Sequence, residues 1–543
     1  MNMKRIKLKL ATAILLGSLM SSCYEDKGNY DYNDLLRVTI MGFLSEKDGA
    51  ETEITSITVT AGQTIKVRPV LSFENENTKM NLTYTWLFKD KVIGNEEKLN
   101  FTATEVISGY VVLDIEDLDT GNHFRANFSL KILDPYAASG FLVLSERGGE
   151  SCLSFLEGTY FENKTGFNPY IGLYQKENDK ILPRDVFKIH EHFRKNSHST
   201  QIMAVCKNDL IDINAYTFKE ENRAAEMFMS GVPTISDVMF MQWVDLVADE
   251  QGRLYKRVKS TNELFHSNRF LPSFVENEDG EVLQGIRFIP GDISNSKNLC
   301  LLYDTYKKRY LIISDWKNSF GNTLGKVVVA KHGSGDKGWS EGFTRLDHME
   351  GYNVIYTGCY LYPREYLNPA ANRYFSIIEK DGVYYHQHFR VNRDYSTGNM
   401  NVTEDKQGVM SGLGSIIQEN NIFCIMRYAQ GFDSSIHPYL LISSGKSLYL
   451  YDITVSSAGS TSEEILKLYE FDSPIVAMNG ECISGTQLGV GLEDGSFHVL
   501  NMTLAKDHLM DKEKLLFWSL PAGQLGTIKD IQYNVQEQSP TFN

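Results

Sequence analysis

Histidines gather most densely at residues 190–198, where their spacing could suit a metal ion. The segment His190–His192 reads His-Glu-His, and His198 follows shortly afterwards. On a strand, two histidines separated by one residue point to the same face, as ligands of one metal would. Arg194 and Lys195 add positive charge beside them, however, and the HExxH pattern of zinc hydrolases is missing. The sequence therefore predicts a solvated loop here, with no metal and no cofactor.

Two further patterns raise the question of catalysis. His386 and His388 follow an Asp-Gly turn on a predicted strand, and we expect this pair to face a pore or the surface. Acidic pairs such as Asp245 and Asp249, or Glu463 with its acidic neighbour, are ordinary in a chain with 69 acidic residues. A glycosidase needs two carboxyl groups at a set distance, and spacing along a chain does not establish that distance.

A glycine-rich loop covers residues 331–342. It lacks the G-x-x-x-x-G-K-[ST] order of a phosphate-binding loop, so we expect a connection between strands. Its end, Gly338–Gly342, matches the string G-x-S-x-G around Ser340. A nucleophile elbow needs a strand directly before that serine and a helix directly after it. The flanking residues predict neither, so we interpret the match as chance and predict no enzyme.

Tryptophans offer a different chemistry, because exposed aromatic rings can stack on sugars or grip a peptide. Four of them lie beyond residue 135, namely Trp243, Trp316, Trp339 and Trp518. Packing in a core is the commoner fate of a tryptophan. Trp339 sits in the polar loop just described, and it is the residue for which we predict a binding role.

The amino-acid composition limits the kinds of molecule that the protein could bind. The 543 residues carry 54 Lys+Arg against 69 Asp+Glu, a formal net charge of −15. This balance disfavours binding to nucleic acid, and also attachment to anionic lipid by charge. The length indicates more than one domain. Aromatic residues make up 12% of the chain, beside 42 Gly and 13 Pro, which favours β-structure with tight turns.

Short alternating segments fill residues 35–134. Residues 82–88 place Tyr84, Trp86 and Phe88 on one face, and residues 123–132 alternate between polar and apolar almost without fault. Turn residues separate about seven such runs, which predicts an immunoglobulin-like β-sandwich. No cysteine lies between residues 24 and 151, so packing around Trp86 would replace the usual disulfide.

From residue 136 onward one theme recurs, in which two apolar strands flank a tight polar turn. Seven such hairpins fall at residues 141–155, 203–218, 245–258, 299–314, 374–389, 439–453 and 487–502. Repeated hairpins are typical of a β-propeller. We therefore predict an all-β chain in which residues 136–543 form a β-propeller of seven blades, completed when residues 527–533 pair with the first blade. An irregular multi-sheet β-domain is the alternative.

The amino terminus predicts export. Residues 1–10 carry four basic residues, and residues 11–20 form an apolar run too short to span a bilayer. We expect residues 1–22 to be a lipoprotein signal peptide, because Met20–Cys23 resembles a bacterial lipobox in which Cys23 is acylated. Residues 23–34 would be an acidic tether, similar to the surface-export signal of Bacteroidetes lipoproteins. An anchor facing the periplasm is the alternative.

Three segments carry a family resemblance. The start Cys23–Tyr30, the strand Tyr84–Trp86 and the closing strand Phe128–Ile132 resemble the PKD-like lipoproteins of Bacteroidetes. The resemblance covers roughly the first 140 residues. It implies an immunoglobulin-like PKD-like module near a lipid anchor, on a cell-surface protein beside nutrient-uptake systems. It implies no catalytic residue.

These observations predict a non-enzymatic lipoprotein of the outer membrane that faces outward. The sandwich would act as a spacer, and the propeller would bind extracellular glycan or peptide beside outer-membrane uptake proteins. Two alternatives stay open. One is a secreted hydrolase or lyase with its active site in the axial pocket of the propeller, and the other is a structural partner of another outer-membrane protein.

Overall fold

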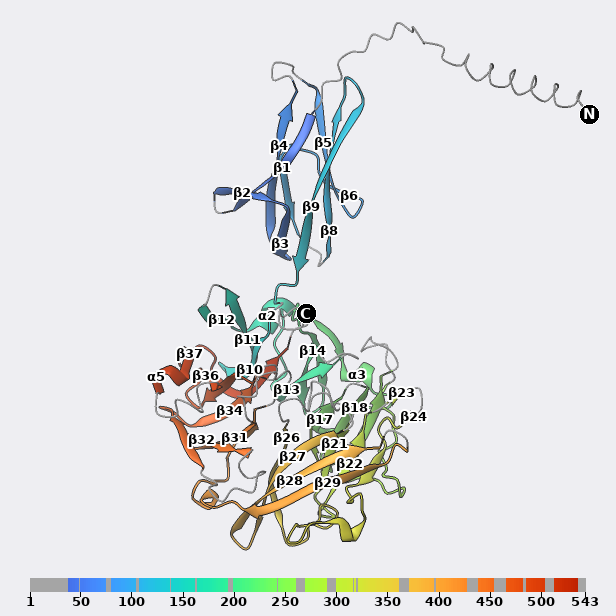
Figure 1. Cartoon of the computed structure of the whole chain (residues 1–543), viewed down its shortest axis with the longest axis vertical. Coiled ribbons are helices and arrows are strands. Elements are labelled where there is room, and N and C mark those ends of the chain that lie inside the picture. The colour runs from blue at the N-terminus through green and yellow to red at the C-terminus, as the bar shows by residue number, and fades with distance from the viewer. Residues whose placement is uncertain are drawn as a thin grey trace, which may run out of the picture. The chain divides into compact units, whose positions relative to one another are not determined.

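The computed structural model describes most of the chain after residue 37 (Figure 1). The described residues are 38–535, apart from 48, 75–79, 104–106, 137, 162–163, 194–198, 242, 260–268, 291–298, 316, 319–320, 361–370, 395–396, 427–437, 454–464, 482–484 and 503–511. Cys23, His198, Trp316 and Glu463 lie outside this set. Contacts divide the chain into two compact units between Leu133 and Asp134.

The first unit is a sandwich of two sheets. Its nine strands, two more than expected, are β1 (Val38–Lys47), β2 (Ala50–Ile54), β3 (Ser56–Thr60), β4 (Thr64–Phe73), β5 (Leu82–Phe88), β6 (Lys91–Gly94), β7 (Leu99–Thr102), β8 (Ser108–Asp117) and β9 (Asn122–Leu133). One sheet has the order β2-β1-β4-β7 and the other β3-β9-β8-β5-β6. Trp86 is fully buried between them, where it packs against Phe43 and Phe128. The sandwich prediction is confirmed.

The second unit contains seven main sheets. The strands of its first three sheets are β10 (Gly140–Arg147), β11 (Glu150–Phe161), β12 (Lys164–Tyr170), β13 (Val186–Phe193), β14 (Ser199–Cys206), β15 (Leu210–Asn214), β16 (Glu220–Arg223), β17 (Ile235–Phe240), β18 (Val244–Asp249) and β19 (Leu254–Val258). The fourth and fifth sheets follow, with β20 (Ile286–Ile289), β21 (Leu299–Asp304), β22 (Arg309–Ser314), β25 (Val327–Val329), β26 (Asn353–Tyr360), β27 (Ala371–Lys380), β28 (Val383–Arg393) and β29 (Met400–Val409). A small separate hairpin joins β23 (Lys317–Asn318) to β24 (Gly321–Asn322).

The sixth and seventh sheets complete the series. Their strands are β30 (Phe423–Ile425), β31 (Tyr439–Ser444), β32 (Ser447–Asp452), β33 (Leu466–Glu470), β34 (Ile475–Gly480), β35 (Gln487–Leu492), β36 (Phe497–Asn501) and β37 (Leu516–Leu520), and β38 (Thr527–Asn534) returns to the first sheet. The short helices are α2 (Leu173–Asn178), α3 (Ala224–Met227), α5 (Lys512–Leu515), η1 (Asp336–Gly338) and η3 (Leu413–Ser415). Within the described residues, no helix has the length and apolar content that a membrane crossing requires.

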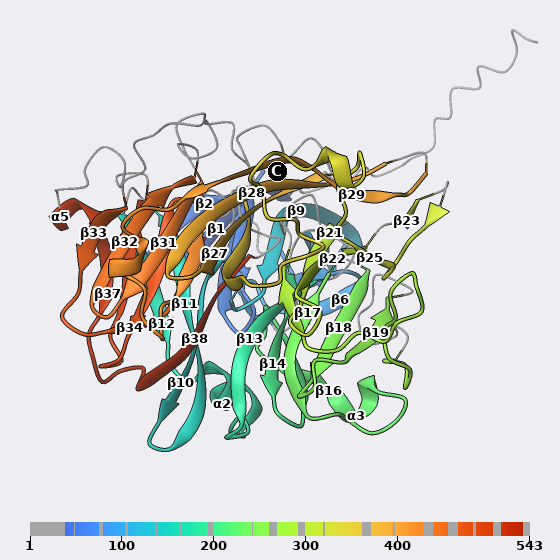
Figure 2. The ribbon, with the colours of Figure 1, turned by 90° about the horizontal axis from the view of Figure 1, so that it is seen from below.

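Packing between the sheets makes the second unit a ring. Seven apolar clusters lie between neighbouring sheets. One of them joins the two ends of the series, because it contains Phe141 of the first sheet and Phe497 of the seventh. An open row of seven sheets would have only six such interfaces. The inner strands, which we define as β38, β13, β17, β20, β26, β30 and β34, contact one another in turn around the ring. Figure 2 shows the sheets arranged around a common centre. This arrangement confirms the seven-bladed β-propeller, although no single sheet closes on itself.

Tight turns account for the repeated hairpins that the sequence predicts. Each of the seven predicted hairpins joins the two middle strands of one sheet, or the last two in the three-stranded third sheet. Asp381 (φ 52°) and Gly382 (φ 80°) are both left-handed, as the two-residue turn between β27 and β28 requires. The chain closes as predicted, because β38 pairs antiparallel with β10 from Gly140 opposite Asn534 to Glu146 opposite Thr527.

Candidate functional site

The densest histidine group lies on a strand and not in a solvated loop, so that prediction is wrong. His190 and His192 belong to β13, and the side chain of His192 is fully buried. Its ring packs against Phe240 of the next sheet at 4.6 Å between centroids. The cations that suggested solvent exposure, Arg194 and Lys195, lie outside the described residues. His192 is buried because the neighbouring sheets supply both apolar cover and polar partners.

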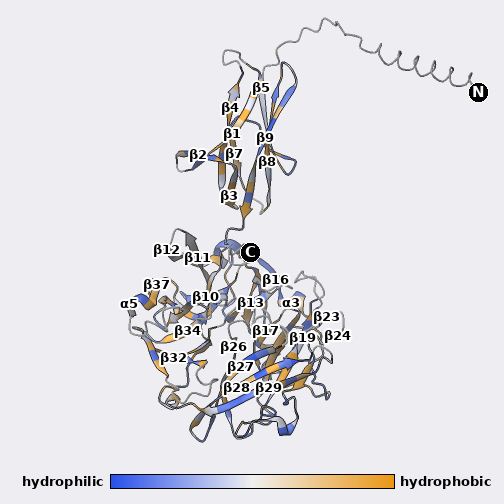
Figure 3. Cartoon of the chain, in the orientation of Figure 1, coloured by the Kyte–Doolittle hydropathy of each residue, from blue (hydrophilic) through white to orange (hydrophobic). Residues whose placement is uncertain are grey.

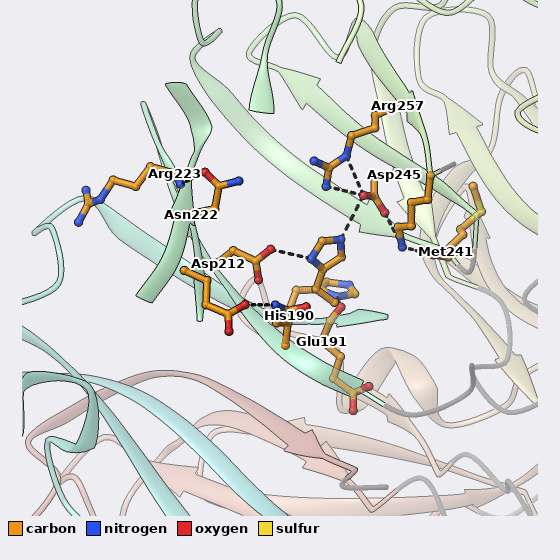
Figure 4. Close-up of polar contacts among 12 residues, drawn as sticks. His190, Glu191, Asp212, Asn222, Arg223, Met241, Asp245 and Arg257 are labelled. Carbon is orange, nitrogen blue, oxygen red and sulfur yellow. Dashed lines mark hydrogen bonds and ion pairs between the residues drawn. The ribbon is translucent and has the colours of Figure 1, made fainter. Parts of the chain in front are cut away.

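Those partners form a buried ionic network between the second and third sheets (Figure 4). His192 Nδ1 lies 3.1 Å from Asp212 Oδ2, and its Nε2 lies 3.1 Å from Asp245 Oδ2. Asp245 also accepts hydrogen bonds from Arg257 Nη2 at 2.6 Å, and its Oδ1 lies 3.0 Å from Lys259 Nζ. None of the five side chains is more than 3% exposed.

The charges of this network depend on one another. Burial raises the pKa of Asp212. Burial would also raise the pKa of Asp245, but Lys259, His192 and Arg257 outweigh it and hold that pKa far below its usual range. Breaking a buried ion pair leaves the remaining charge without a partner or water. The network therefore joins two sheets, and its members are sealed from any substrate in this conformation.

The second acid of the predicted pair, Asp249, caps a turn. Its Oδ1 accepts the N–H groups of Gln251 and Arg253 at 3.0 and 2.9 Å, and its Oδ2 accepts from Arg253 Nε at 2.7 Å. Asp304 plays the same part in the fourth sheet, where its Oδ1 accepts from the backbone N–H of Lys307. These acids fix the tight turns that join the middle strands, which accounts for several of the carboxylates in the chain.

His386 and His388 are both buried, so the prediction of a surface or pore-facing pair is wrong. They lie on β28, a strand of largely hydrophilic sequence (Figure 3), between the fifth and sixth sheets. His388 Nδ1 lies 3.0 Å from the hydroxyl of Tyr360, and both histidine rings lie against Phe375. Burial lowers the pKa of His386 to about 4, so the ring is neutral at physiological pH. Among the described residues, no three His, Cys, Asp or Glu side chains are grouped to hold a metal.

The glycine-rich loop does not form a nucleophile elbow. Ser340 follows the 3-10 helix η1 instead of a strand, and no helix follows it. Its hydroxyl donates to the carbonyl of Asp405 at 3.1 Å, and its N–H donates to the carboxylate of the same residue. His332 Nε2 also approaches Asp405 Oδ1, at 3.6 Å. The aspartate thus holds the loop, and no Ser–His contact of the catalytic kind is present among these described residues.

The described tryptophans of the propeller are half-buried. Trp339 stacks on Phe343 with ring centroids 5.4 Å apart and an angle of 5°, against the core between the fourth and fifth sheets. Trp243 packs against the core between the third and fourth sheets, and Trp518 packs against the core between the seventh and first sheets. The binding role of Trp339 stays a prediction.

Sequence reasoning missed a polar region between the inner strands of the first and second sheets. We call it the polar seam and define it as Glu191 on β13 with Asp530, Gln532 and Asn534 on β38. The N–H of Ile189 donates to Asp530 Oδ2 at 2.8 Å. The seam joins residues about 340 positions apart, because ring closure alone brings β38 beside β13. The only signal in the sequence was the alternation of polar and apolar residues at positions 530–535.

The seam carries carboxyl groups, and the cation beside it is paired with an aspartate of the third sheet. Burial raises the pKa of Asp530 to about 6, although it accepts two backbone N–H groups. Lys188 on β13 lies nearby and is bonded to Asp237 on β17, with 2.7 Å between Nζ and Oδ1. Both ends of this ion pair are about one-third exposed, at 36% and 33%. The inner strands of the first three sheets therefore present charged and amide groups to solvent at the centre of the ring.

Comparisons with known proteins bear on the fold only. Solved structures similar to this chain include a quinonprotein alcohol dehydrogenase-like protein from Bacteroides thetaiotaomicron (13% identity, TM-score 0.38, 88% of this chain and 96% of that chain covered). Others are a DUF4784 family protein from Bacteroides caccae (9%, 0.29, 92% and 100%) and apo AztD from Citrobacter koseri (7%, 0.34, 72% and 83%). These TM-scores are low, so the fold assignment rests on the strand pairing of the chain itself. No curated protein matches the chain.

One family model matches. It is that of the PKD-like family, and it covers residues 23–184. The match takes in the whole sandwich and continues into the first sheet of the propeller and α2. By this match, residues 23–184 are similar to the PKD-like family.

Proposed function

We propose that this protein is a non-enzymatic lipoprotein of the outer membrane, anchored through acylated Cys23 and facing outward. Its propeller binds extracellular glycan or peptide beside an uptake system, and its PKD-like sandwich acts as the spacer. The observation that carries this proposal is how the reactive side chains are used. His192, Asp212 and Asp245 are fully buried and bonded to one another, which favours a scaffold over a catalyst.

Strand connectivity supports a binding surface formed by the connections between strands. Turns between the two middle strands are short, as between Lys380 and Val383. Outside the third sheet, connections from inner to second strands are longer, as from Tyr360 to Ala371 and from Ile425 to Tyr439. In up-and-down sheets these two kinds of connection lie on opposite sides. Long connections also join the outer strand of one sheet to the inner strand of the next, as from Val258 to Ile286, and these lie on the other side. Binding residues are commonly carried by long connections on a rigid scaffold, so both sides of the propeller carry connections suited to binding.

A binding screen tests this proposal. The full-length protein, solubilised in detergent, is applied to arrays of glycans and peptides, and the bound material is then checked for cleavage. We expect binding without turnover. Hydrolysis or elimination of a bound glycan would show that the protein is an enzyme.

The anchor needs a test of its own. Cells that express the chain are labelled with a palmitate analogue, and we expect label and outer-membrane location for the natural chain. Cys23→Ala should lose both. A labelled Cys23→Ala variant, or an unlabelled natural chain, would contradict anchoring at this residue.

A further inference from the structure

The two faces of β38 differ in character. Ile531, Tyr533 and Val535 point into the apolar core shared with the seventh sheet. Asp530 points the other way, because its carboxylate accepts the N–H of Ile189 in the second sheet. Side chains two positions apart share a face of a strand, so Gln532 and Asn534 share this face with Asp530. Three polar side chains in a row therefore line the inner end of the interface between the first and second sheets.

Asn534 is the most unusual member of the polar seam. Its side chain is fully buried, yet among the described residues neither its Nδ2 nor its Oδ1 has a hydrogen-bond partner. Buried amides in folded proteins are nearly always hydrogen-bonded, because burial without a partner is costly. Glu191, across the seam, is 2% exposed and accepts the N–H of Val535 at 3.3 Å. The seam thus holds an amide that can both donate and accept.

Exposure to solvent falls along the seam. Asp530 and Gln532 are half-buried, whereas Asn534 and Glu191 are buried. A ligand would therefore meet Asp530 and Gln532 first. The amide of Asn534 is closed to solvent in this conformation, so a ligand would reach it only when the seam opens locally.

Backbone N–H groups along the seam are already bonded. Four N–H groups each donate to a side-chain oxygen, namely those of Ile189, Ile531, Tyr533 and Val535. The acceptor for Tyr533 is Asn479. An extended peptide recognises a sheet edge mainly through free backbone groups, and these four N–H groups are taken. Recognition here depends on side-chain amides and carboxyls, which together donate to and accept from hydroxyl groups.

Charge further limits the ligand. The seam contributes two carboxyl groups, Asp530 and Glu191, and the nearby cation Lys188 is already bonded to Asp237. An anionic ligand such as a uronic acid would be repelled. We propose that the polar seam is the site at which the propeller hydrogen-bonds a neutral, hydroxyl-rich ligand, such as the end of a neutral glycan chain. This inference rests on the proposed function and names the ligand class of its binding module.

Two substitutions test the seam directly. Asn534→Leu and Gln532→Leu each replace an amide by a branched apolar side chain that cannot hydrogen-bond a ligand. Lys529→Gln is the matched control, because Lys529 lies on the same strand but binds Glu146 on the opposite side, with 2.9 Å between Nζ and Oε2. Affinity of the full-length protein in detergent is measured for neutral oligosaccharides and for oligosaccharides that contain uronic acid. Thermal unfolding of each variant shows whether it is folded.

We expect the natural chain to bind neutral oligosaccharides in preference to acidic ones. Each seam variant should bind about tenfold more weakly, as loss of a ligand hydrogen bond predicts, and the control should be unchanged. Neutral glycan binding that is unaffected in both folded variants would overturn the seam as the site and leave the binding function intact. Binding of peptides or acidic glycans alone would overturn the ligand class. An absence of all binding would overturn the proposed function as well.

Discussion

The inner strands of the propeller differ between the two sides of the ring. On the side of the first three sheets they carry Lys188, Asp237 and Asp530 beside the buried network around His192. On the side of the fifth and sixth sheets the corresponding contact is aromatic, since Tyr356 of β26 stacks on Phe423 of β30 with 5.0 Å between centroids. One fold thus uses ion pairs and amides on one side and apolar packing on the other.

This difference indicates that some interfaces between sheets mainly stabilise the propeller, whereas others can recognise a ligand. Apolar interfaces stabilise the ring without regard to direction. Polar interfaces contribute little net stability, because their groups lose water on burial. Such groups are retained where they set a unique arrangement or meet a ligand, so the polar side is where we place binding.

The largest effect should come from breaking the buried network. Asp245→Asn would leave Arg257 and Lys259 buried without their anion, and we expect a loss of about 3–5 kcal/mol in the free energy of unfolding. Denaturant unfolding followed by tryptophan fluorescence measures it. Asp381→Asn, in an exposed turn of the fifth sheet, is the control and should change little. A loss below about 1 kcal/mol for Asp245→Asn would mean that water reaches the network.

A substitution on the apolar side sharpens the comparison. Leu441 is fully buried between the sixth and seventh sheets, and Leu441→Ala should cost about 2–4 kcal/mol through lost burial and the cavity left behind. Unlike the loss at Asp245, this loss should not depend on salt or pH. The same denaturant unfolding measures this loss at several salt concentrations. A loss for Leu441→Ala that changes strongly with salt would contradict the distinction between the two sides.

Local patterns allowed most of the fold to be predicted. The Asp381-Gly382 turn and its six counterparts are encoded by residues next to one another, and so is the alternation in β9 and β38. The excess of two strands in the sandwich comes from short pieces such as β2 and β6, which have no long alternating pattern.

The candidate site could not be predicted in the same way, because its contacts are between sheets. His192 was assigned to solvent from its neighbours Arg194 and Lys195, whereas its partners Asp212 and Asp245 come from other strands. The polar seam needs β38 to lie beside β13, far away in the chain. Alternation predicts which residues share a face, but not what the next sheet places opposite them.

Protonation of Asp530 should make the polar side sensitive to pH. Because burial raises its pKa to about 6 in the folded protein, the native state binds this proton more tightly than the unfolded chain does. The free energy of unfolding should therefore fall as the pH rises from about 4 to about 6, by about 1–2 kcal/mol from this group. Asp530→Asn should flatten that slope, while Asp381→Asn should keep it. An equal slope in all three proteins would contradict a raised pKa.

The smallest effect on stability should come from the amide that has no partner. Asn534→Leu removes a buried polar group without breaking a hydrogen bond, so the free energy of unfolding should stay within about 1 kcal/mol of the natural value or rise. Asn479→Leu is the matched control. Its Oδ1 accepts the N–H of Tyr533 at 3.1 Å, and we expect a loss of about 1–2 kcal/mol. A larger loss for Asn534→Leu than for Asn479→Leu would mean that a bound water already satisfies Asn534. In that case the seam would have no free amide to offer a ligand, and the polar side would be structural like the apolar one.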